Sequence, residues 1–332
     1  MKRRHTLFFA LILFLVPNFA AGESARIGYL AAYYPWIAAI ADGKFETSTG
    51  YRIEWKRYET GAEVINALRT NEIDIGSVGS PPLAAALSLG HNIELFWILQ
   101  SYSFSESLVV RKGTRIVNPQ DLRGRRVAVP FASTSHYHLL FALSQFRIGP
   151  EDVRIFYSTP AQIREQWDNQ DIDAAFVWNP VHDQILRTGK VIITSGRLSR
   201  WGKPIFDGLV ADRDWARVHQ SFMVTFVKTL AAQDQDYREN RKAWTRHSKN
   251  IQKLVDMLGG TKFSAYKSLR STKYPKLEDQ VSRNWLAGGA NALTVLALED
   301  TAKFLKAHGV INTNLNSYAE GVNPNWARQA LK

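Results

Sequence analysis

The stretch NPQDLRGRRVAVPFASTSHYHLL, residues 118–140, decides the fold of this chain. Inside it, the short apolar run at 127–130 predicts a strand that ends at a proline. A loop rich in hydroxyl groups follows, and residues 136–146 then have the spacing of a helix. A short strand that leads through a loop into a helix is typical of α/β proteins.

The same alternation extends in both directions along the chain. Further strands are predicted at residues 26–30, 51–57, 73–78, 93–99, 107–111, 153–157, 173–178 and 191–194. Helices are predicted at 35–46, 62–70, 81–89 and 160–166, with a helical turn at 118–122. After Asp207 the pattern becomes mainly helical, with helices expected at 220–240, 251–258 and 290–308. The sequence shows no internal repeat.

This organisation predicts an α/β fold with two lobes and a mainly helical C-terminal tail that returns to brace the first lobe. We expect the chain to cross between the lobes near Ser105 and Gly208. Residues 23–106 and 209–332 then form lobe I, and residues 107–208 form lobe II. The length of 332 residues suits two domains of ordinary size.

Residues 1–22 have the features of a secretory signal peptide. Three basic residues at 2–4 precede ten apolar residues at 7–16, a run too short to span a bilayer. Small residues then predict cleavage near Gly22 and export to the periplasm. An uncleaved N-terminal anchor is the alternative.

The charge of the chain is basic but dispersed. Loss of the signal peptide removes three cations and no acid, which lowers the net charge from +12 to +9. The remaining Lys and Arg lie beside turns rather than in a stripe with aromatics, so we expect a basic surface and no nucleic-acid partner. The chain has no cysteine, which excludes disulfides, zinc fingers and thiol catalysis.

Ser133, Thr134 and Ser135 place three hydroxyl groups where a helix is predicted to begin. The N-terminus of a helix offers free N–H groups and about half a positive charge. That arrangement suits an oxyanion such as sulfonate, and an ordinary helix cap is the alternative. His136 is placed to reach the same anion. His138 lies two positions on and faces away, so the two histidines do not predict a metal site.

Five stretches carry a resemblance to a known family. They are EIDIGSVGSPPLAAAL (72–87), SESLVVRKG (105–113), the stretch at 118–140, DIDAAFVWNP (171–180) and RWGKPIFDGLVADRDW (200–215). Together they resemble the periplasmic taurine-binding proteins of bacterial ABC transporters, within the wider sulfonate- and nitrate-binding group. The resemblance covers about residues 26–310. The phrase at 121–126 is common to the whole group, whereas 131–140 and 178–180 are more specific.

The resemblance implies a two-lobed, monomeric binding protein with a hinge, which closes on one small ligand and uses no cofactor or metal. Its partners are taurine or a related sulfonate, and an ABC permease and ATPase complex. The implied contacts to the sulfonate end are Ser80, Ser133, Thr134, Ser135 and His136. The implied contacts to the ammonium end are Glu106, Trp178 and Asp207.

The sequence departs from the family pattern at Pro81, where relatives commonly carry a second serine. Proline removes both a hydroxyl and a backbone donor, so we expect a ligand contact from Ser80 but none from position 81.

The ammonium-end residues each have a second interpretation. Glu106 and Asp207 flank apolar strands, where a buried carboxylate is costly unless a cation pairs with it. That cation is either the ligand's ammonium or a Lys or Arg of the protein. Trp178 lies either against the ligand, where its ring meets a cation, or in the core.

Three aromatic residues surround Pro35, namely Tyr33, Tyr34 and Trp36. They either cap the pocket or pack beneath the lobe. If they cap it, a larger or aromatic sulfonate becomes the alternative ligand.

Other function classes are weaker. Thiamine-pyrimidine synthases share the fold superfamily, but their cysteine-rich signature is missing from this cysteine-free chain. The sequence has no His-Glu-x-x-His helix, no Gly-x-Ser-x-Gly elbow and no phosphate loop. A ligand-sensing subunit stays open. We therefore predict a binding subunit of an importer and not an enzyme.

Overall fold

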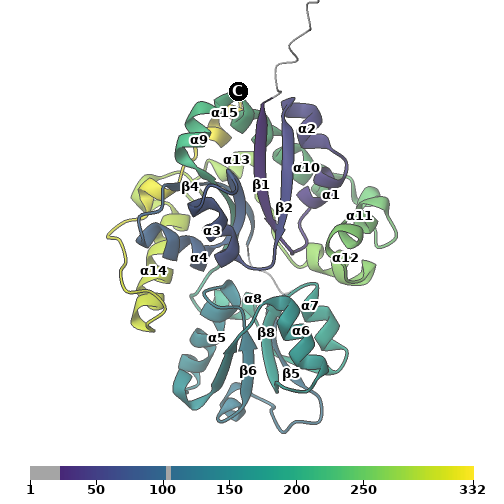
Figure 1. The fold of residues 1–332 in the computed structure, drawn as a ribbon, viewed down its shortest axis with the longest axis vertical. Helices are drawn as coiled ribbons and strands as arrows, with labels where there is room; N and C mark the ends of the chain where they lie inside the picture. The colour runs from purple at the N-terminus through teal and green to yellow at the C-terminus, as the bar shows by residue number, and fades with distance from the viewer. Residues whose placement is uncertain (1–22, 102–105) are drawn as a thin grey trace, which may run out of the picture.

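The structure, a computed structural model, describes residues 23–101 and 106–332 and shows two lobes, one above the other in Figure 1. Each lobe is built on a five-stranded sheet with helices against it. The two-lobed α/β class predicted from the sequence is confirmed. The predicted signal peptide at 1–22 and the predicted crossing near Ser105 lie outside the described residues.

The sheet of the first lobe has the order β2-β1-β3-β10-β4. β1 pairs in parallel with β2 and β3, and β10 runs antiparallel to both β3 and β4. These strands are β1 Ser24–Leu30, β2 Arg52–Tyr58, β3 Ile75–Gly79, β4 Ile93–Ser101 and β10 Phe206–Asp212.

The sheet of the second lobe has the order β7-β6-β8-β5-β9. β6 is parallel to β7 and β8, and β5 is antiparallel to β8 and β9. Its strands are β5 Glu106–Arg111, β6 Arg126–Val129, β7 Arg154–Tyr157, β8 Ala174–Trp178 and β9 Gly189–Thr194.

Helices cover the faces of both sheets. Those of the first lobe are α1 Trp36–Ala41, α2 Lys44–Thr49, α3 Gly61–Arg69, α4 Ser80–Ser88, α9 Arg213–Val218, α10 Gln220–Glu239, α11 Lys249–Leu258, α12 Lys262–Arg270, α13 Leu277–Gln280, α14 Leu293–Ala307 and α15 Asn325–Ala330. Those of the second lobe are α5 Thr134–Gln145, α6 Pro160–Asp168, α7 Val181–Leu186 and α8 Ser195–Arg200. Short 3-10 helices lie at η1 Pro119–Leu122, η2 Pro150–Asp152, η3 Arg241–Trp244, η4 Gly289–Asn291 and η5 Ala319–Gly321. None of the helices in the described part of the chain is long and apolar enough to cross a membrane.

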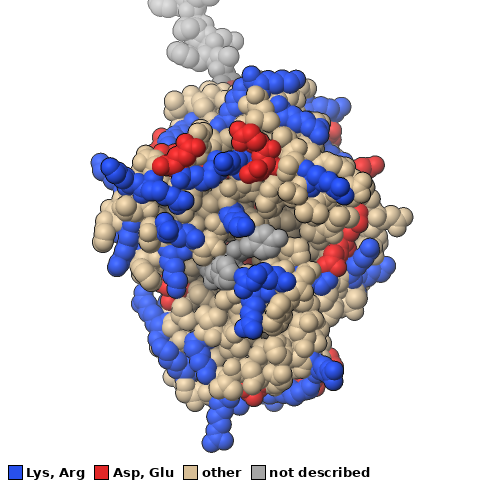
Figure 2. Space-filling view, turned by 180° about the vertical axis from the view of Figure 1, so that it is seen from behind, with Lys and Arg blue, Asp and Glu red and all other residues tan. Residues whose placement is uncertain are grey.

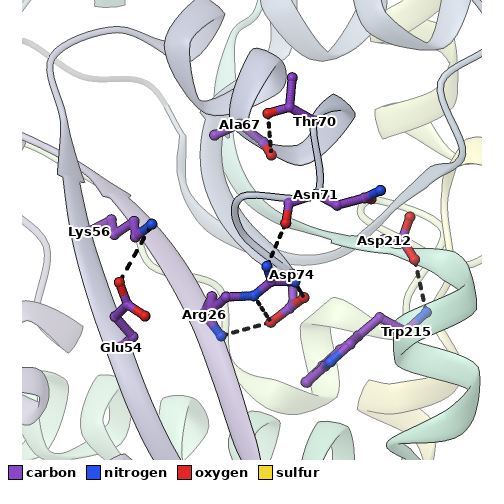
Figure 3. A network of polar contacts seen from close by, with 9 residues as sticks. All are labelled: Arg26, Glu54, Lys56, Ala67, Thr70, Asn71, Asp74, Asp212 and Trp215. Carbon is purple, nitrogen blue, oxygen red and sulfur yellow. Dashed lines mark hydrogen bonds and ion pairs between the residues drawn. The ribbon is translucent and has the colours of Figure 1, made fainter.

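The two lobes repeat one topology, although the sequence shows no repeat. In each, two parallel neighbours flank a first strand, and an antiparallel strand from the lobe crossing followed by a fifth strand completes the sheet. An equivalent ion pair lies at the amino ends of the parallel strands. Arg26 of β1 binds Asp74, which precedes β3, at 2.5 Å from Nη2 to Oδ1 (Figure 3). Arg126 of β6 binds Asp173, which precedes β8, at 2.9 Å between the same atoms.

The single helix predicted at 35–46 is wrong, because the structure has two helices there. α1 ends at Ala41 and α2 begins at Lys44. Gly43 between them has a φ of 63°, a left-handed conformation that interrupts a right-handed helix.

The lobe limits predicted from the sequence are slightly displaced. Glu106, placed in lobe I, opens β5 and pairs with Trp178 in the second sheet. Asp207 and Gly208, placed in lobe II, lie in β10 and pair with β3 in the first sheet. Strand pairing, which joins residues far apart in sequence, decides these positions.

The C-terminal tail braces the first lobe, as predicted, and also reaches the second. α14 packs on α4, and α15 packs on α10 and β4. Phe304 of α14 meets the ring of Tyr137 of α5 at 5.1 Å between centroids. Asp300 of α14 binds Lys203 Nζ at 2.6 Å and accepts a hydrogen bond from Tyr137 Oη at 3.3 Å. The tail therefore contacts both lobes beside their connection.

Candidate ligand-binding site

A pocket lies between the two lobes, at the carboxyl ends of the parallel strands, where α/β sheets commonly bind ligands. The second lobe contributes Glu106, Ser133, Thr134, Trp178 and Asn179. The first lobe contributes the polar residues Tyr33, Tyr34, Gln100, Asp207 and Ser268. Leu30, Ala32, Gly61, Gly79 and Pro82 of the first lobe complete the wall. Polar groups of both lobes thus face one small space.

Asp207 is held by donors from its own lobe. It lies at the start of β10, opposite Gly79 at the end of β3. Its Oδ2 accepts hydrogen bonds from Gln100 Nε2 at 2.5 Å and from Tyr34 Oη at 3.1 Å. Both donors belong to the first lobe, so the carboxylate moves with that lobe.

Glu106 is held in the same way by the second lobe. It opens β5, opposite Trp178 at the end of β8. Thr134 Oγ1 donates to its Oε2 at 2.9 Å, and Ser195 Oγ donates to its Oε1 at 3.0 Å. Ser195, at the start of α8, was not predicted from the sequence.

The two carboxylates occupy equivalent positions in the repeated topology. Each lies at the start of the antiparallel strand and opposite the last residue of a parallel strand. Each accepts a hydrogen bond from a side chain that follows the first parallel strand of its lobe, Tyr34 after β1 and Thr134 after β6. The lobes therefore present one acid each to the shared pocket. We call Glu106 and Asp207 the carboxylate pair.

The charge inside the pocket is opposite to that of the surface. Figure 2 shows Lys and Arg spread over both lobes. Among the described residues that line the pocket, none is Lys or Arg, and the charged ones are the carboxylate pair. A ligand with a positive group therefore has two carboxylates to meet and no protein cation to displace.

Burial makes both acids hard to ionise in the empty pocket. Loss of hydration raises the pKa of Glu106 to about 7, and the negative charge of Asp207 adds to this shift. Loss of hydration likewise raises the pKa of Asp207 to about 6, although hydrogen bonds from Gln100 and Tyr34 oppose the change. A cation placed between them would restore the charged forms.

The hydroxyl loop before α5 is only partly directed at the pocket. Ser133 caps the helix, because its Oγ accepts from His136 N at 3.1 Å and donates to Pro130 O at 2.6 Å. Thr134 gives its hydroxyl hydrogen to Glu106, and the nearby Ser135 hydroxyl also lowers the pKa of that acid. Ser133 and Thr134 line the pocket, whereas Ser135 is fully buried behind it.

His136 lies away from the pocket wall. Its Nδ1 accepts from Ala132 N at 3.2 Å, and its ring packs against Phe131 and Tyr157. Burial lowers its pKa to about 4, so the ring is neutral at physiological pH. His138 is fully buried and bonds to Lys203 O at 2.9 Å through Nε2. No cluster of metal-binding side chains occurs among the described residues.

Ser80 also lies outside the pocket wall. It is fully buried, and its Oγ accepts from Phe206 N at 3.3 Å. α4 begins at Ser80 and continues with Pro81 and Pro82, so two of its first backbone donors are missing. Pro82 rather than Ser80 lines the pocket, and this helix end is a poor anion site.

The comparisons with known proteins agree with this architecture. Residues 29–242 match a family model described as "ABC transporter, phosphonate, periplasmic substrate-binding protein". The taurine-binding periplasmic protein of Escherichia coli K12 is 33% identical over 322 residues, which cover 97% of this chain and 98% of that protein. The chain belongs to the periplasmic substrate-binding proteins of ABC transporters.

Two further comparisons extend this family assignment. A putative aliphatic sulfonates-binding protein of E. coli K12 is 26% identical over 69% of this chain and 72% of its own length. The solved alkanesulfonate-binding protein of Xanthomonas axonopodis pv. citri, bound to MOPS, superposes with a TM-score of 0.73 at 21% identity. That alignment covers 88% of this chain and 95% of the solved chain and shows the shared fold. The resemblance identified from the sequence motifs is confirmed.

The aromatic residues of this substrate-binding protein divide into two groups. Tyr33 and Tyr34 form part of the pocket wall, and Tyr33 Oη donates to Gly259 O at 2.7 Å. Trp36 instead packs edge-on against Trp55 at 5.8 Å between ring centroids, in the core beneath the lobe. Trp178 of the second lobe lines the pocket and rests on the first-lobe core.

The lobes approach closely at Gly79. A β-carbon on this residue would lie 2.8 Å from Thr134 Cγ2 of the second lobe and 3.3 Å from Asp207 Oδ1. Only the absence of a side chain at position 79 allows the first-lobe backbone to touch Thr134. This contact lies directly beside the carboxylate pair.

Sequence reasoning missed Gln100 and Ser195, the two donors that complete the anchoring of the acids. Both follow apolar strands, but a single Gln or Ser in such a place has no distinctive pattern. The two residues can be found by comparing the lobes. Gln100 lies in β4 and Ser195 follows β9, and β4 and β9 are the corresponding edge strands of the two sheets.

Proposed function

We propose that this protein binds taurine in the interlobe pocket and delivers it to the permease and ATPase of an ABC importer. The carboxylate pair carries the proposal. Two buried acids that share a pocket without a protein cation are costly, and a ligand ammonium offsets that cost. Taurine supplies an ammonium two carbons away from its sulfonate.

The sulfonate end is best served by helix N-termini. The first turn of α5 presents the backbone N–H groups of Thr134 and Ser135, and Gly61 in the wall opens α3. Ser133 shapes this end as the cap of α5. Trp178 lies beside the carbon chain of the ligand. In this proposal Ser80 and His136 support the pocket without contacting the ligand.

The proposal includes a periplasmic monomer, cleaved near Gly22, that binds and does not catalyse. Ser107 and His182 form a 2.6 Å hydrogen bond of the kind seen in hydrolases, but both are buried and neither lines the pocket. The pair therefore supports the fold of the second lobe. The family membership favours a transport role over a separate enzymatic one.

Calorimetry on the mature protein tests the function. Taurine, ethanesulfonate and benzenesulfonate are titrated at pH 8, where both carboxylates ionise most readily. We expect taurine to bind far more tightly than ethanesulfonate, because ethanesulfonate leaves the carboxylate pair uncompensated. Equal affinity for ethanesulfonate would assign the pocket to plain sulfonates. Tighter binding of benzenesulfonate would assign it to aromatic ones, with Tyr33 and Tyr34 as the contact surface.

A further inference from the structure

We propose that the ligand's ammonium closes the lobes: the carboxylate pair is a cation site divided between the lobes, which opposes closure when empty and favours it when a cation is bound. This inference rests on the proposed function and adds to it a role for the ammonium beyond recognition.

Each carboxylate is fixed to one lobe. Gln100 and Tyr34 hold Asp207, and both are first-lobe residues. Thr134 and Ser195 hold Glu106, and both are second-lobe residues. Neither acid accepts a hydrogen bond from the opposite lobe among the described residues. Relative motion of the lobes therefore changes the separation of the two charges.

The lobes are in contact in this structure. Thr134 lies against the backbone at Gly79, and Asp207 Oδ1 lies near the same point. Ser264 Oγ of the first lobe also donates to Asn179 Oδ1 of the second at 3.2 Å. In this arrangement Asp207 is close enough to disfavour ionisation of Glu106.

Three tyrosines are the other titratable groups near the pair. They are Tyr33 and Tyr34 on the loop before α1 and Tyr274 after α12. Burial raises the pKa of all three, so they stay neutral. From α5 the pair meets Thr134, and from α8 it meets Ser195, neither of which ionises. Between pH 5.5 and 8 the charge here is set by the two acids.

It follows that closing the empty protein at high pH brings two like charges together in a dehydrated space. A ligand ammonium removes this penalty and biases the equilibrium toward the closed form, as any ligand that prefers one state does. A proton on one acid acts in the same direction. Ethanesulfonate, which has the anion but no cation, occupies the pocket without removing the penalty.

The test measures the distance between the lobes. The chain has no cysteine, so Lys228→Cys on α10 and Glu165→Cys on α6 introduce two exposed labelling sites. Spin-label distances are recorded for the empty protein from pH 8 to 5.5, and at pH 8 with saturating taurine or ethanesulfonate. Occupancy is verified by calorimetry. The same pair of labels is placed in Glu106→Gln, in Asp207→Asn and in the control Glu278→Gln, an exposed acid on α13 away from the pocket wall.

We expect taurine to give the short distance and saturating ethanesulfonate to leave most molecules at the long one. The empty protein shifts toward the short distance as the pH falls, and empty Glu106→Gln and Asp207→Asn do so already at pH 8, whereas Glu278→Gln matches the unmodified protein. Full closure by ethanesulfonate overturns the inference. So does an empty-state distance that is indifferent to pH and to both pocket substitutions. Failure of taurine to bind overturns the proposed function instead, since the empty-protein measurements use no ligand.

Discussion

In the proposed function, one buried side chain, that of Asp207, sets the ligand preference. Its carboxylate is oriented by Gln100 and Tyr34, so one oxygen is occupied by the protein and the charge remains available to the pocket. Because no protein cation lines the wall among the described residues, an ammonium is the partner that compensates the acid.

Asp207→Asn should therefore weaken taurine binding and strengthen ethanesulfonate binding, because the pocket then holds only one carboxylate that a ligand without an ammonium leaves uncompensated. Removal of one member of a buried charge pair costs about 2–5 kcal/mol, which raises the taurine Kd roughly 30-fold or more. Calorimetry with both ligands checks this. If the variant keeps the full preference for taurine over ethanesulfonate, Asp207 does not belong to the ammonium site.

The same burial predicts how stability depends on pH. In the empty folded protein the pKa of Glu106 is about 7 and that of Asp207 about 6, both above the values of an unfolded chain. At these two acids the folded state thus binds more protons, so their contribution to stability is largest at low pH and is lost as the pH rises through 6 to 7. His136, His138 and His182, whose pKa burial lowers to about 4, act in the opposite direction, so the contribution of the acids is isolated by comparing variants. In thermal unfolding between pH 5.5 and 8, Glu106→Gln should gain Tm relative to the unmodified protein as the pH rises, while Glu278→Gln on the surface of α13 should follow the unmodified protein.

At the scale of elements, the N-terminal turn of α5 combines two tasks in adjacent residues. Ser133 caps the helix through His136 N, and Thr134 orients Glu106. Neighbouring hydroxyls that look interchangeable in the sequence thus act on different parts of the protein.

Separate substitutions should distinguish these tasks. Ser133→Ala removes the cap and should cost about 1 kcal/mol of stability. Thr134→Val keeps the shape but removes a hydrogen bond to a charged group, about 1.5–3 kcal/mol, which lowers taurine affinity roughly tenfold or more. Chemical unfolding and calorimetry on both variants give the comparison. If Thr134→Val binds taurine normally, its bond to Glu106 has no role in the site.

How much of the structure could be predicted from the sequence also differs between elements. Local patterns were enough to locate the buried strands, because a short apolar run such as that of β8 consists of consecutive residues. Glu106 and Asp207 were recognisable as acids beside apolar strands. Their convergence was implied by the family resemblance but not by the residues themselves, since it depends on how two sheets meet. The hydrogen bond from Thr134 to Glu106 likewise had no local signal. Gln100 and Ser195 come from distant strands and had no local signal.

At the scale of the whole molecule, α14 links the lobes outside the pocket. Asp300 binds Lys203 beside the lobe connection and accepts from Tyr137, while Phe304 packs on Tyr137. These contacts belong to the lobe arrangement seen in this structure. They should therefore contribute to ligand affinity from a distance.

Asp300→Asn should raise the taurine Kd modestly without changing the preference over ethanesulfonate. Half-exposed ion pairs of this kind contribute about 0.2–1 kcal/mol, equivalent to less than about fivefold in Kd. Competition calorimetry measures such a change. An altered preference between the two ligands would show instead that α14 acts on the pocket itself.

The close approach of the two lobes at Gly79 affects how a mixture of normal and variant binding proteins would behave. The backbone of Gly79, with φ −78° and ψ 160°, tolerates alanine, so the added methyl group would act by its contacts with Thr134 and Asp207. The Gly79→Ala variant should bind ligand in the pocket, but its two lobes should not close fully. A transporter that recognises loaded carriers by their shape would treat such molecules as empty. Mixed with normal protein, they would sequester taurine without delivering it, and one methyl group would make the variant a dominant inhibitor of uptake.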